Sequence, residues 1–329
     1  MPNYEVHYLD VADADSIIIR YDNGKNKYIV LIDAGNVGDS DKIKNYIWNH
    51  WRTHTIDLAI CTHPDSDHKG GFFGLLIDSE ININEFWINS PDDVINESKY
   101  KILYPNGNWM EHCRECYVHP TDAHSTDLVS LALDKCTKVL SAYKGNVHSE
   151  IPISVVAPTI EFYDPLAIEI LKGNKRVKEV DNTEYEDVGQ FSSTEAKSSI
   201  DREPDDSSPT NAGSIILLFE PVKGRKFLLL GDANRAAITD ALANNDNLSG
   251  CSIKVPHHGS KHNLTSSLID ELAPCCAIIS AKGTRKHPSR GIVHCLSKYC
   301  NVYSTHKSKG LYHPSSPMGN PATPLKEKQ

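Results

Sequence analysis

The chain has 329 residues, is 39% hydrophobic and carries a net charge of −9 from 34 basic and 43 acidic side chains. This length can bury one large hydrophobic core or two small ones. The acidic balance argues against a broad electrostatic surface for nucleic acid, because such a surface usually requires a surplus of basic residues. A small basic patch beside a metal remains compatible with it.

The sequence also indicates in which cellular compartment the protein is found. No apolar run approaches the roughly 18 residues that suggest a transmembrane helix, so we expect no membrane contact. The N-terminal stretch MPNYEVHYLDVADAD lacks the basic and apolar pattern of a secretory leader. The nine cysteines are odd in number and scattered, which favours reduced thiols over disulfides. We therefore expect a cytoplasmic protein.

Apolar periodicity predicts an opening set of strands followed by alternating helices and strands. Strands are predicted at 6–9, 16–20, 28–32, 56–61, 85–89, 153–157, 214–219, 226–230, 252–255, 277–279 and 302–305. Helices are predicted at 40–51, 72–77, 127–143, 165–171, 236–243 and 266–272. Nearly every polar cluster follows a strand, and loops at strand ends are where layered α/β proteins build their sites.

Three segments interrupt this pattern. The stretch 92–108 is polar and predicts a surface loop. The stretch 173–208 contains ten acidic and five basic residues and predicts a mobile loop, because it cannot bury enough apolar surface to offset its ordering entropy. The tail 307–329, with several prolines and lysines, predicts disorder. We expect one domain over 1–306, with insertions near 90–126 and at 173–208.

The most informative stretch is CTHPDSDHKGG, which follows the predicted strand 56–61 and contains His63, Asp65, Asp67 and His68. Imidazole and carboxylate groups together suit zinc, manganese or iron. One loop cannot surround an ion and leave it an open coordination position, so partners are required further along the chain. Candidates follow three later strands, in LLLGD (Asp232), VPHHGS (His257, His258) and KHPS (His287).

These blocks resemble the metallo-β-lactamase fold superfamily, in the branch typified by the hydrolase domain of the competence DNA-uptake protein ComEC. In that branch the superfamily's commoner H-x-H-x-D-H motif reads H-x-D-x-D-H, as HPDSDH does here. The likeness continues in order through YLDVADADSIII, VLIDAG, NAGSIILLF, LLLGDA, VPHHGS and HPS. It implies an α/β fold of the αββα sandwich type, in which two mixed β-sheets pack face to face and helices flank them.

The resemblance also implies a centre of two divalent metal ions. His63 and Asp65 would bind one ion, Asp67 and His68 the other, and Asp232 would bridge them. The histidine pair would supply one further ligand, and we favour His258 over His257. Asp33 would lie outside the coordination sphere and orient either a ligand or the turn.

One expected ligand is missing. The superfamily usually has a further histidine shortly before the bridging aspartate, and this chain has no histidine between His148 and His257. Asn211 lies near the expected position and could substitute through its carbonyl oxygen or through a water molecule.

Such a centre predicts a metal-dependent hydrolase, most simply a phosphodiesterase or nuclease that acts on DNA with a hydroxide activated by two ions. The extra carboxylate Asp65 shifts the preference toward manganese, and zinc stays an alternative. Asp67, Asp232 and His287 are the predicted catalytic residues. The predicted phosphate contacts are Ser260, Lys261, Lys282 and Ser289. The alternatives are a small phosphodiester substrate, such as a cyclic nucleotide or a phosphocholine-type ester, and a non-catalytic module of a larger complex with a protein partner.

Overall fold

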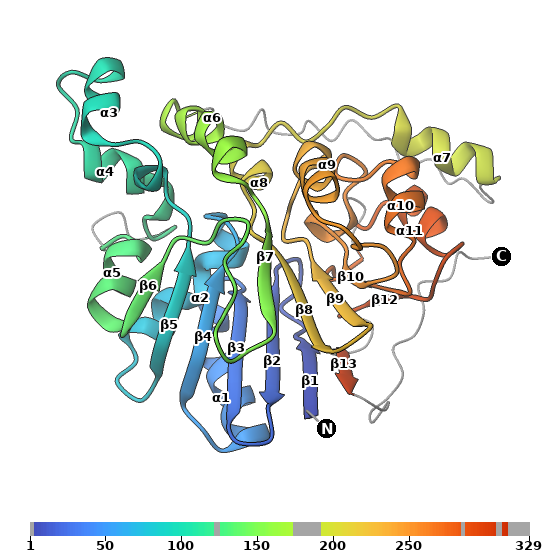
Figure 1. Cartoon of the computed structure of the whole chain (residues 1–329), viewed down its shortest axis with the longest axis horizontal. Coiled ribbons are helices and arrows are strands. Elements are labelled where there is room, and N and C mark those ends of the chain that lie inside the picture. Colours follow the sequence, from blue (N-terminus) through green and yellow to red (C-terminus); the bar gives the residue numbers. More distant parts are fainter. Residues whose placement is uncertain (1–2, 122–125, 174–191, 284–286, 307–310, 315–329) are drawn as a thin grey trace.

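The computed structural model describes residues 3–121, 126–173, 192–283, 287–306 and 311–314, the last range by its backbone alone. Two mixed β-sheets form the centre of the molecule (Figure 1). The seven-stranded sheet has the order β13-β1-β2-β3-β4-β5-β6, and the six-stranded sheet has the order β12-β11-β10-β9-β8-β7. The strands are β1 Asn3–Tyr8, β2 Ser16–Asp22, β3 Lys27–Ala34, β4 Thr55–Cys61, β5 Asn82–Ile88, β6 Lys138–Leu140, β7 Ile153–Ala157, β8 Ile216–Val222, β9 Arg225–Leu229, β10 Ser252–Lys254, β11 Cys276–Ile279, β12 Val302–Ser304 and β13 Leu311–Pro314.

Helices cover the outer face of each sheet, which gives the αββα sandwich that the sequence predicts. They are α1 Ser40–Trp51, α2 Ser66–Ile77, α3 Glu97–Leu103, α4 Trp109–Arg114, α5 Leu128–Lys135, α6 Ile160–Leu171, α7 Ser193–Asp201, α8 Pro209–Ala212, α9 Arg235–Asn244, α10 Ser266–Leu272 and α11 Arg290–Leu296. Helices α1, α2 and α5 pack on the seven-stranded sheet, and α7, α9, α10 and α11 pack on the six-stranded sheet.

Strand β3 shows why the central strands are apolar at every position rather than at alternate positions. Val30 and Ile32 pack toward the six-stranded sheet, and Ile29 and Leu31 pack toward the helices. Because successive side chains of a strand point to opposite faces, a strand covered on both faces is apolar at every position.

The two sheets repeat one topology. In β1 to β6 and again in β7 to β12, two antiparallel pairings are followed by three parallel pairings between strands that are consecutive in sequence. Strand β9 therefore corresponds to β3, and β10 to β4. The segments after β4, β9 and β10 carry all the predicted metal ligands, and the end of β3 carries Asp33, so both halves of the chain contribute to the site.

The helix after β4 begins earlier than the sequence predicts. We expected it at 72, beyond the double glycine, whereas α2 begins at Ser66 and includes Gly70 and Gly71. A Cβ atom on Gly70 would clash with the Val37 amide, and one on Gly71 would clash with the Ala34 carbonyl. The glycines therefore allow α2 to approach the end of β3 closely, and this contact overrides their low helix propensity.

Four other predictions also differ from the structure. The segment 92–108, predicted as a loop, contains α3, and α4 follows it directly. The helix predicted at 127–143 ends at Lys135, and the chain continues into β6. In the segment 173–208, residues 193–201 form α7, whose Ala196 and Ile200 are buried, while 174–191 lie outside the described residues. In the tail predicted as disordered, residues 311–314 form β13 beside β1. Helix α11 was not predicted at all.

Among the described residues, no helix is both long and apolar enough to cross a membrane.

The close contact of α2 with β3 can be tested by adding one methyl group. We expect Gly71→Ala to lower the free energy of unfolding by about 1–3 kcal/mol, because the new Cβ overpacks against the Ala34 carbonyl. Gly38→Ala is the matched control, since nothing lies within 4 Å of its added Cβ, and we expect a change within about 0.5 kcal/mol. Urea unfolding measures both, and equal effects would contradict the packing role of Gly71.

Candidate metal centre

The ligand-rich motif divides between a loop and the start of a helix. His63 and Asp65 lie in the loop after β4, and Asp65 is the N-cap residue of α2. Asp67 and His68 lie in the first turn of that helix. The two pairs therefore lie on different elements, and the carboxylate of Asp67 lies at the positive end of the helix dipole.

A left-handed turn brings the second histidine pair to the same place. Three consecutive residues have positive φ, at 46° for His257, 54° for His258 and 79° for Gly259. The non-glycine residues each store on the order of 1–3 kcal/mol of strain in this region. In a strand, the two imidazoles would point to opposite faces, whereas this turn directs both toward the site. The His258 ring is fixed by a 2.7 Å contact from Nδ1 to the Ser280 carbonyl oxygen.

Asp232 lies at the centre of the cluster, shortly after β9, and is 1% exposed. Its Oδ1 is 3.3 Å from Nε2 of His68. Its Oδ2 is 3.8 Å from Nε2 of His63 and 3.9 Å from Nε2 of His257. The two oxygens of one carboxylate therefore face different imidazoles.

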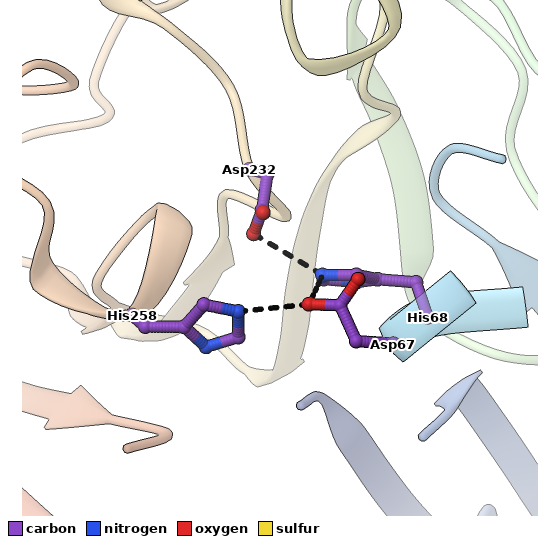
Figure 2. Close-up of side chains that lie close together, drawn as sticks. All are labelled: Asp67, His68, Asp232 and His258. Atoms are coloured by element: carbon purple, nitrogen blue, oxygen red, sulfur yellow. Dashed lines mark hydrogen bonds and ion pairs between the residues drawn. The ribbon is translucent and has the colours of Figure 1, made fainter. Parts of the chain in front are cut away.

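The tightest group consists of Asp67, His68, Asp232 and His258, whose ligand atoms all lie within 4.8 Å of one another (Figure 2). Nε2 of His258 is 3.1 Å from Oδ2 of Asp67, and Nε2 of His68 is 3.7 Å from the same oxygen. This group could hold a metal ion. Two residues of each half of the sandwich form it, so neither half has the site alone.

Asp33 orients the central histidine. Its Oδ2 lies 2.8 Å from Nδ1 of His68, so that Nε2 of the ring faces Asp232. Thr62 donates to Asp33 through its backbone amide and its hydroxyl, both at 2.8 Å. Asp33 itself has a φ of 55°, in the left-handed region, and this strain is characteristic of a functional position.

Beneath the centre lies a buried cation that belongs to the protein. Lys254, on β10, is 1% exposed and forms an ion pair with Asp15. Its ammonium group is 3.7 Å from Oδ1 of Asp232 and donates to the Gly231 carbonyl oxygen at 2.9 Å. A second possible ligand group, made of Asp15, Asp33 and His68, adjoins this ammonium, so Lys254 already supplies the positive charge there.

The carboxylates of this cluster stabilise positive charge. Burial acts to lower the pKa of His68, but the charges of Asp232 and Asp33 outweigh it and hold that pKa well above its usual value. Burial acts to raise the pKa of Asp232, but His68 and His257 hold it well below its usual value. Burial lowers the pKa of His63 to about 3, so that His63 stays neutral, the form in which imidazole binds metals.

The donor atoms fit a metal centre. Within the described residues, Nε2 of His63, Nε2 of His68 and Oδ1 of Asp232 are buried and form no hydrogen bond of normal geometry. Nε2 of His68 and Oδ1 of Asp232 form an ion pair with each other at 3.3 Å, whereas the carboxylate oxygens of Asp65 and Asp232 lie 3.7 Å and 3.8 Å from Nε2 of His63. A buried polar atom without a hydrogen bond costs about 1–3 kcal/mol, so the position of His63 Nε2 is unexpected in a purely structural cluster. Mixed imidazole and carboxylate donors suit zinc or manganese, and cations bound there would satisfy all three atoms.

Most of the predicted ligands converge. His63, Asp65, Asp67, His68, Asp232, His257 and His258 lie around the two oxygens of Asp232. His258 belongs to the tightest group, and His257 also faces Asp232. Asn211 lies beside this cluster: its Nδ2 donates to Asp206 at 2.7 Å and is 3.4 Å from Nδ1 of His257.

The predicted catalytic residue His287 lies beside the histidine pair. Its side chain is buried, and its ring centroid is 5.5 Å from that of His257 and 6.0 Å from that of His258.

The four residues predicted to contact phosphate each have another position or partner in the structure. The ammonium group of Lys261 is paired with Glu203 at 3.0 Å. Ser260 is buried, and its hydroxyl accepts from the His262 amide. Lys282 is exposed and bonds through its backbone amide to Asp13. Ser289 is the N-cap residue of α11.

None of these four lines the pocket that opens beside the ligand motif. This pocket has a volume of about 320 Å³. Its described lining is Pro64, Asp65, Ser66, Asp67, Cys116, Ile170, Gly173, Ser208, Pro209 and Thr210.

Four functional candidates escaped the sequence reasoning. Asp15 and Lys254 form the buried ion pair, Thr210 donates to Asp65 at 3.2 Å, and Asp206 contacts His257 at 3.0 Å. A lysine inside the apolar strand SIKV was a usable signal, because a buried lysine requires a carboxylate partner. Asp206 carried no such signal, since it is one of ten acidic residues in 173–208.

No protein-family model matches the sequence, and none of the curated proteins matches it. Among solved structures, the chain is similar to one titled Rm3 metallo-beta-lactamase, with 12% sequence identity and a TM-score of 0.36. The alignment covers 87% of this chain and 84% of that chain. At this level of similarity the fold assignment comes from the sheets and helices themselves.

Metal content tests the centre directly. We expect Asp232→Asn to lose bound zinc or manganese. The two carboxylate oxygens of Asp232 face the imidazoles of His63 and His68, and the amide of asparagine carries no charge. Asp134→Asn is the control, since Asp134 is an exposed carboxylate with 71% of its side chain accessible. Equilibrium dialysis with elemental analysis measures bound metal. A variant that retains the full wild-type content would refute the central role of Asp232.

The buried Lys254 allows a stability test. We expect Lys254→Met to destabilise the fold by about 3–5 kcal/mol, because the buried carboxylate of Asp15 then loses its ammonium partner. Lys25→Met, in the exposed turn between β2 and β3, is the control, with an expected change within about 0.5 kcal/mol. Chemical unfolding of the metal-free proteins gives both values, and a Lys254→Met protein as stable as the control would contradict the ion-pair account.

Proposed function

We propose that this protein is a metal-dependent hydrolase of the metallo-β-lactamase superfamily, in its H-x-D-x-D-H branch, and that it cleaves phosphodiester bonds. One observation carries the proposal: the two oxygens of the buried Asp232 face different sets of metal-ligand atoms. A carboxylate in this position can bridge two cations. Sites with two metal ions are typical of enzymes that displace groups at phosphorus.

Zinc or manganese ions bound there would lower the pKa of a water molecule toward neutrality and offset negative charge that develops on a phosphoryl oxygen. The protein's own residues hold and orient the ligands. Asp33 fixes the ring of His68, and the Ser280 carbonyl fixes the ring of His258. These outer contacts keep the Nε2 atoms directed toward the site.

His287 is our candidate for protonating the leaving oxygen. Its buried ring lies beside those of His257 and His258, so it would be close to a substrate bound at these two histidines. Imidazole is the side chain best suited to transfer a proton near neutral pH.

DNA is the substrate that the sequence resemblance favours. A phosphodiester suits this site better than a neutral amide or lactone, because a cradle with three carboxylates, Asp65, Asp67 and Asp232, favours retention of two cations. Those cations can then attract an anionic group.

A second candidate substrate is a small phosphodiester. The pocket beside the motif, at about 320 Å³, matches the size of small-ligand sites. No lysine or arginine stands among its described lining residues, and a groove for a DNA backbone usually has several.

Activity assays test these proposals together. We expect the wild-type protein with manganese or zinc to cleave single-stranded DNA, double-stranded DNA or bis(p-nitrophenyl) phosphate. We expect Asp232→Asn to lower kcat/KM by more than about 100-fold, since loss of outer-sphere partners alone costs about 10–100-fold. Asp134→Asn should match the wild type.

His287→Gln separates proton transfer from metal binding. We expect it to lower kcat by about 100–10,000-fold at unchanged metal content, as is usual for loss of a general acid. A wild-type protein that binds metal and leaves every diester intact would refute the enzymatic proposal and favour a non-catalytic module. Relative rates on oligonucleotides and small diesters distinguish the two substrate classes.

A further inference from the structure

The Oδ2 side of Asp232 has a ligand set of its own. Nε2 of His63 and Nε2 of His257 lie 3.8 Å and 3.9 Å from this oxygen. Oδ2 of Asp65 lies 3.7 Å from Nε2 of His63. Asp232 Oδ2 and three further ligand-type side chains, His63, Asp65 and His257, are therefore linked by distances of 3.7–3.9 Å, apart from the group formed with Asp67, His68 and His258.

An unsatisfied buried atom belongs to this ligand set. His63 is 1% exposed, and its Nε2 has no hydrogen-bond partner among the described residues. Its Nδ1 lies 3.0 Å from the Thr62 hydroxyl. The ring is thus fixed on one side and presents its other nitrogen toward Asp232, as a metal ligand would.

The strained backbone at His257 also directs a ring nitrogen toward Asp232. His257 and His258 both have positive φ, which non-glycine residues adopt at a cost of on the order of 1–3 kcal/mol each. An extended backbone would have turned one of the two rings away. The strained backbone directs the rings of both His257 and His258 toward the site. A ligand role for His258 alone therefore does not account for the strain at His257.

A carboxylate outside the cluster holds the His257 ring. Oδ2 of Asp206 lies 3.0 Å from Nδ1 of His257, and Asn263 Oδ1 lies 3.1 Å from the same nitrogen. Asp206 is itself fixed, since Asn211 donates to its Oδ2 at 2.7 Å. A carboxylate that contacts Nδ1 of an imidazole, with Nε2 facing the metal position, is the usual arrangement around protein-bound metal ions.

We propose that His257 is a metal ligand, with His63, Asp65 and Asp232, and that Asp206 is its positioning residue. This inference rests on the proposed metal-dependent function. It explains how the chain compensates for the histidine that the sequence lacks between His148 and His257.

The two sides of Asp232 should bind metal unequally. The atoms of Asp67, His68, Asp232 and His258 all lie within 4.8 Å of one another, and His63, Asp65 and His257 are not part of that compact group. Ligands that must move inward to reach an ion lose affinity. We therefore expect a tighter site on the Oδ1 side and a weaker one on the Oδ2 side.

Cobalt binding tests the assignment without an activity assay. Equilibrium dialysis against Co²⁺ gives the number of bound ions and their dissociation constants, and the visible absorption of bound Co²⁺ reports the ligand environment. We expect two ions of unequal affinity in the wild type. His257→Ala and the larger His257→Gln should lose the weaker ion, while His258→Ala should impair the tighter one.

The positioning role of Asp206 has its own matched control. We expect Asp206→Ala to weaken the weaker site by about 10–100-fold, and Asp206→Asn to weaken it less, because an amide oxygen can still accept from Nδ1. Asp205→Asn is the control. The carboxylate of Asp205 accepts from the backbone amides of Asp206, Arg235 and Ala236, so it supports the same segment without a hydrogen bond or ion pair to His257. Thermal unfolding by circular dichroism establishes that each variant is folded.

The outcomes separate the inference from the proposed function. A wild-type protein that binds fewer than two ions would overturn the metal pair, and the inference with it. Two ions in the wild type and two ions of unchanged affinity in both folded His257 variants would overturn the inference alone. Equal weakening in Asp205→Asn and Asp206→Ala would show that Asp206 only stabilises its segment.

Discussion

The structure depends on one buried carboxylate surrounded by positive or proton-bearing groups from both halves of the chain. Asp232 is 1% exposed, and burying a charge is costly unless partners compensate it. His68 and Lys254 lie at 3.3 Å and 3.7 Å from its Oδ1, while Oδ2 faces His63 and His257. Lys254 forms its closer ion pair with Asp15, so Asp232 shares this ammonium group with a second carboxylate. The remaining negative potential is available for cations at the open side of the cluster.

The repeated topology explains how residues so distant in sequence meet. The ends of β3 and β4 supply Asp33 and the H-x-D-x-D-H motif, and the corresponding ends of β9 and β10 supply Asp232 and the histidine pair. Face-to-face packing of the two sheets then brings the four loops together. The close approach of α2 to β3 at Gly70 and Gly71 completes this arrangement, because it places His68 within 2.8 Å of Asp33. The geometry of the centre is therefore a direct consequence of packing between the halves.

Sequence reasoning worked where the determining forces are local. The bounds of α1, α10 and β7 were predicted correctly because each is a continuous amphipathic or apolar run with clear ends. It failed at α2, where packing of two glycines overrides their helix propensity, and at β13, whose strand exists through pairing with β1. The ligand motif was recognisable because its residues are adjacent. Asp206 was not, because only tertiary contacts select its partners. Lys254 did carry a signal, as a lysine within an apolar strand, but its partner Asp15 is likewise selected by tertiary contacts alone.

The same electrostatics reconcile a net charge of −9 with the anionic substrate that we propose. Asp65 and Asp67 line the pocket beside the motif, so a phosphodiester that approached the metal-free protein would meet two carboxylates and no described basic side chain. Like charges at such distances repel, and they do so more strongly where the surroundings exclude water. Bound cations reverse the local sign without any change in the net charge of the surface. In this proposal substrate binding therefore follows metal binding, and the acidic composition prevents anions from occupying the pocket before the metal ions do.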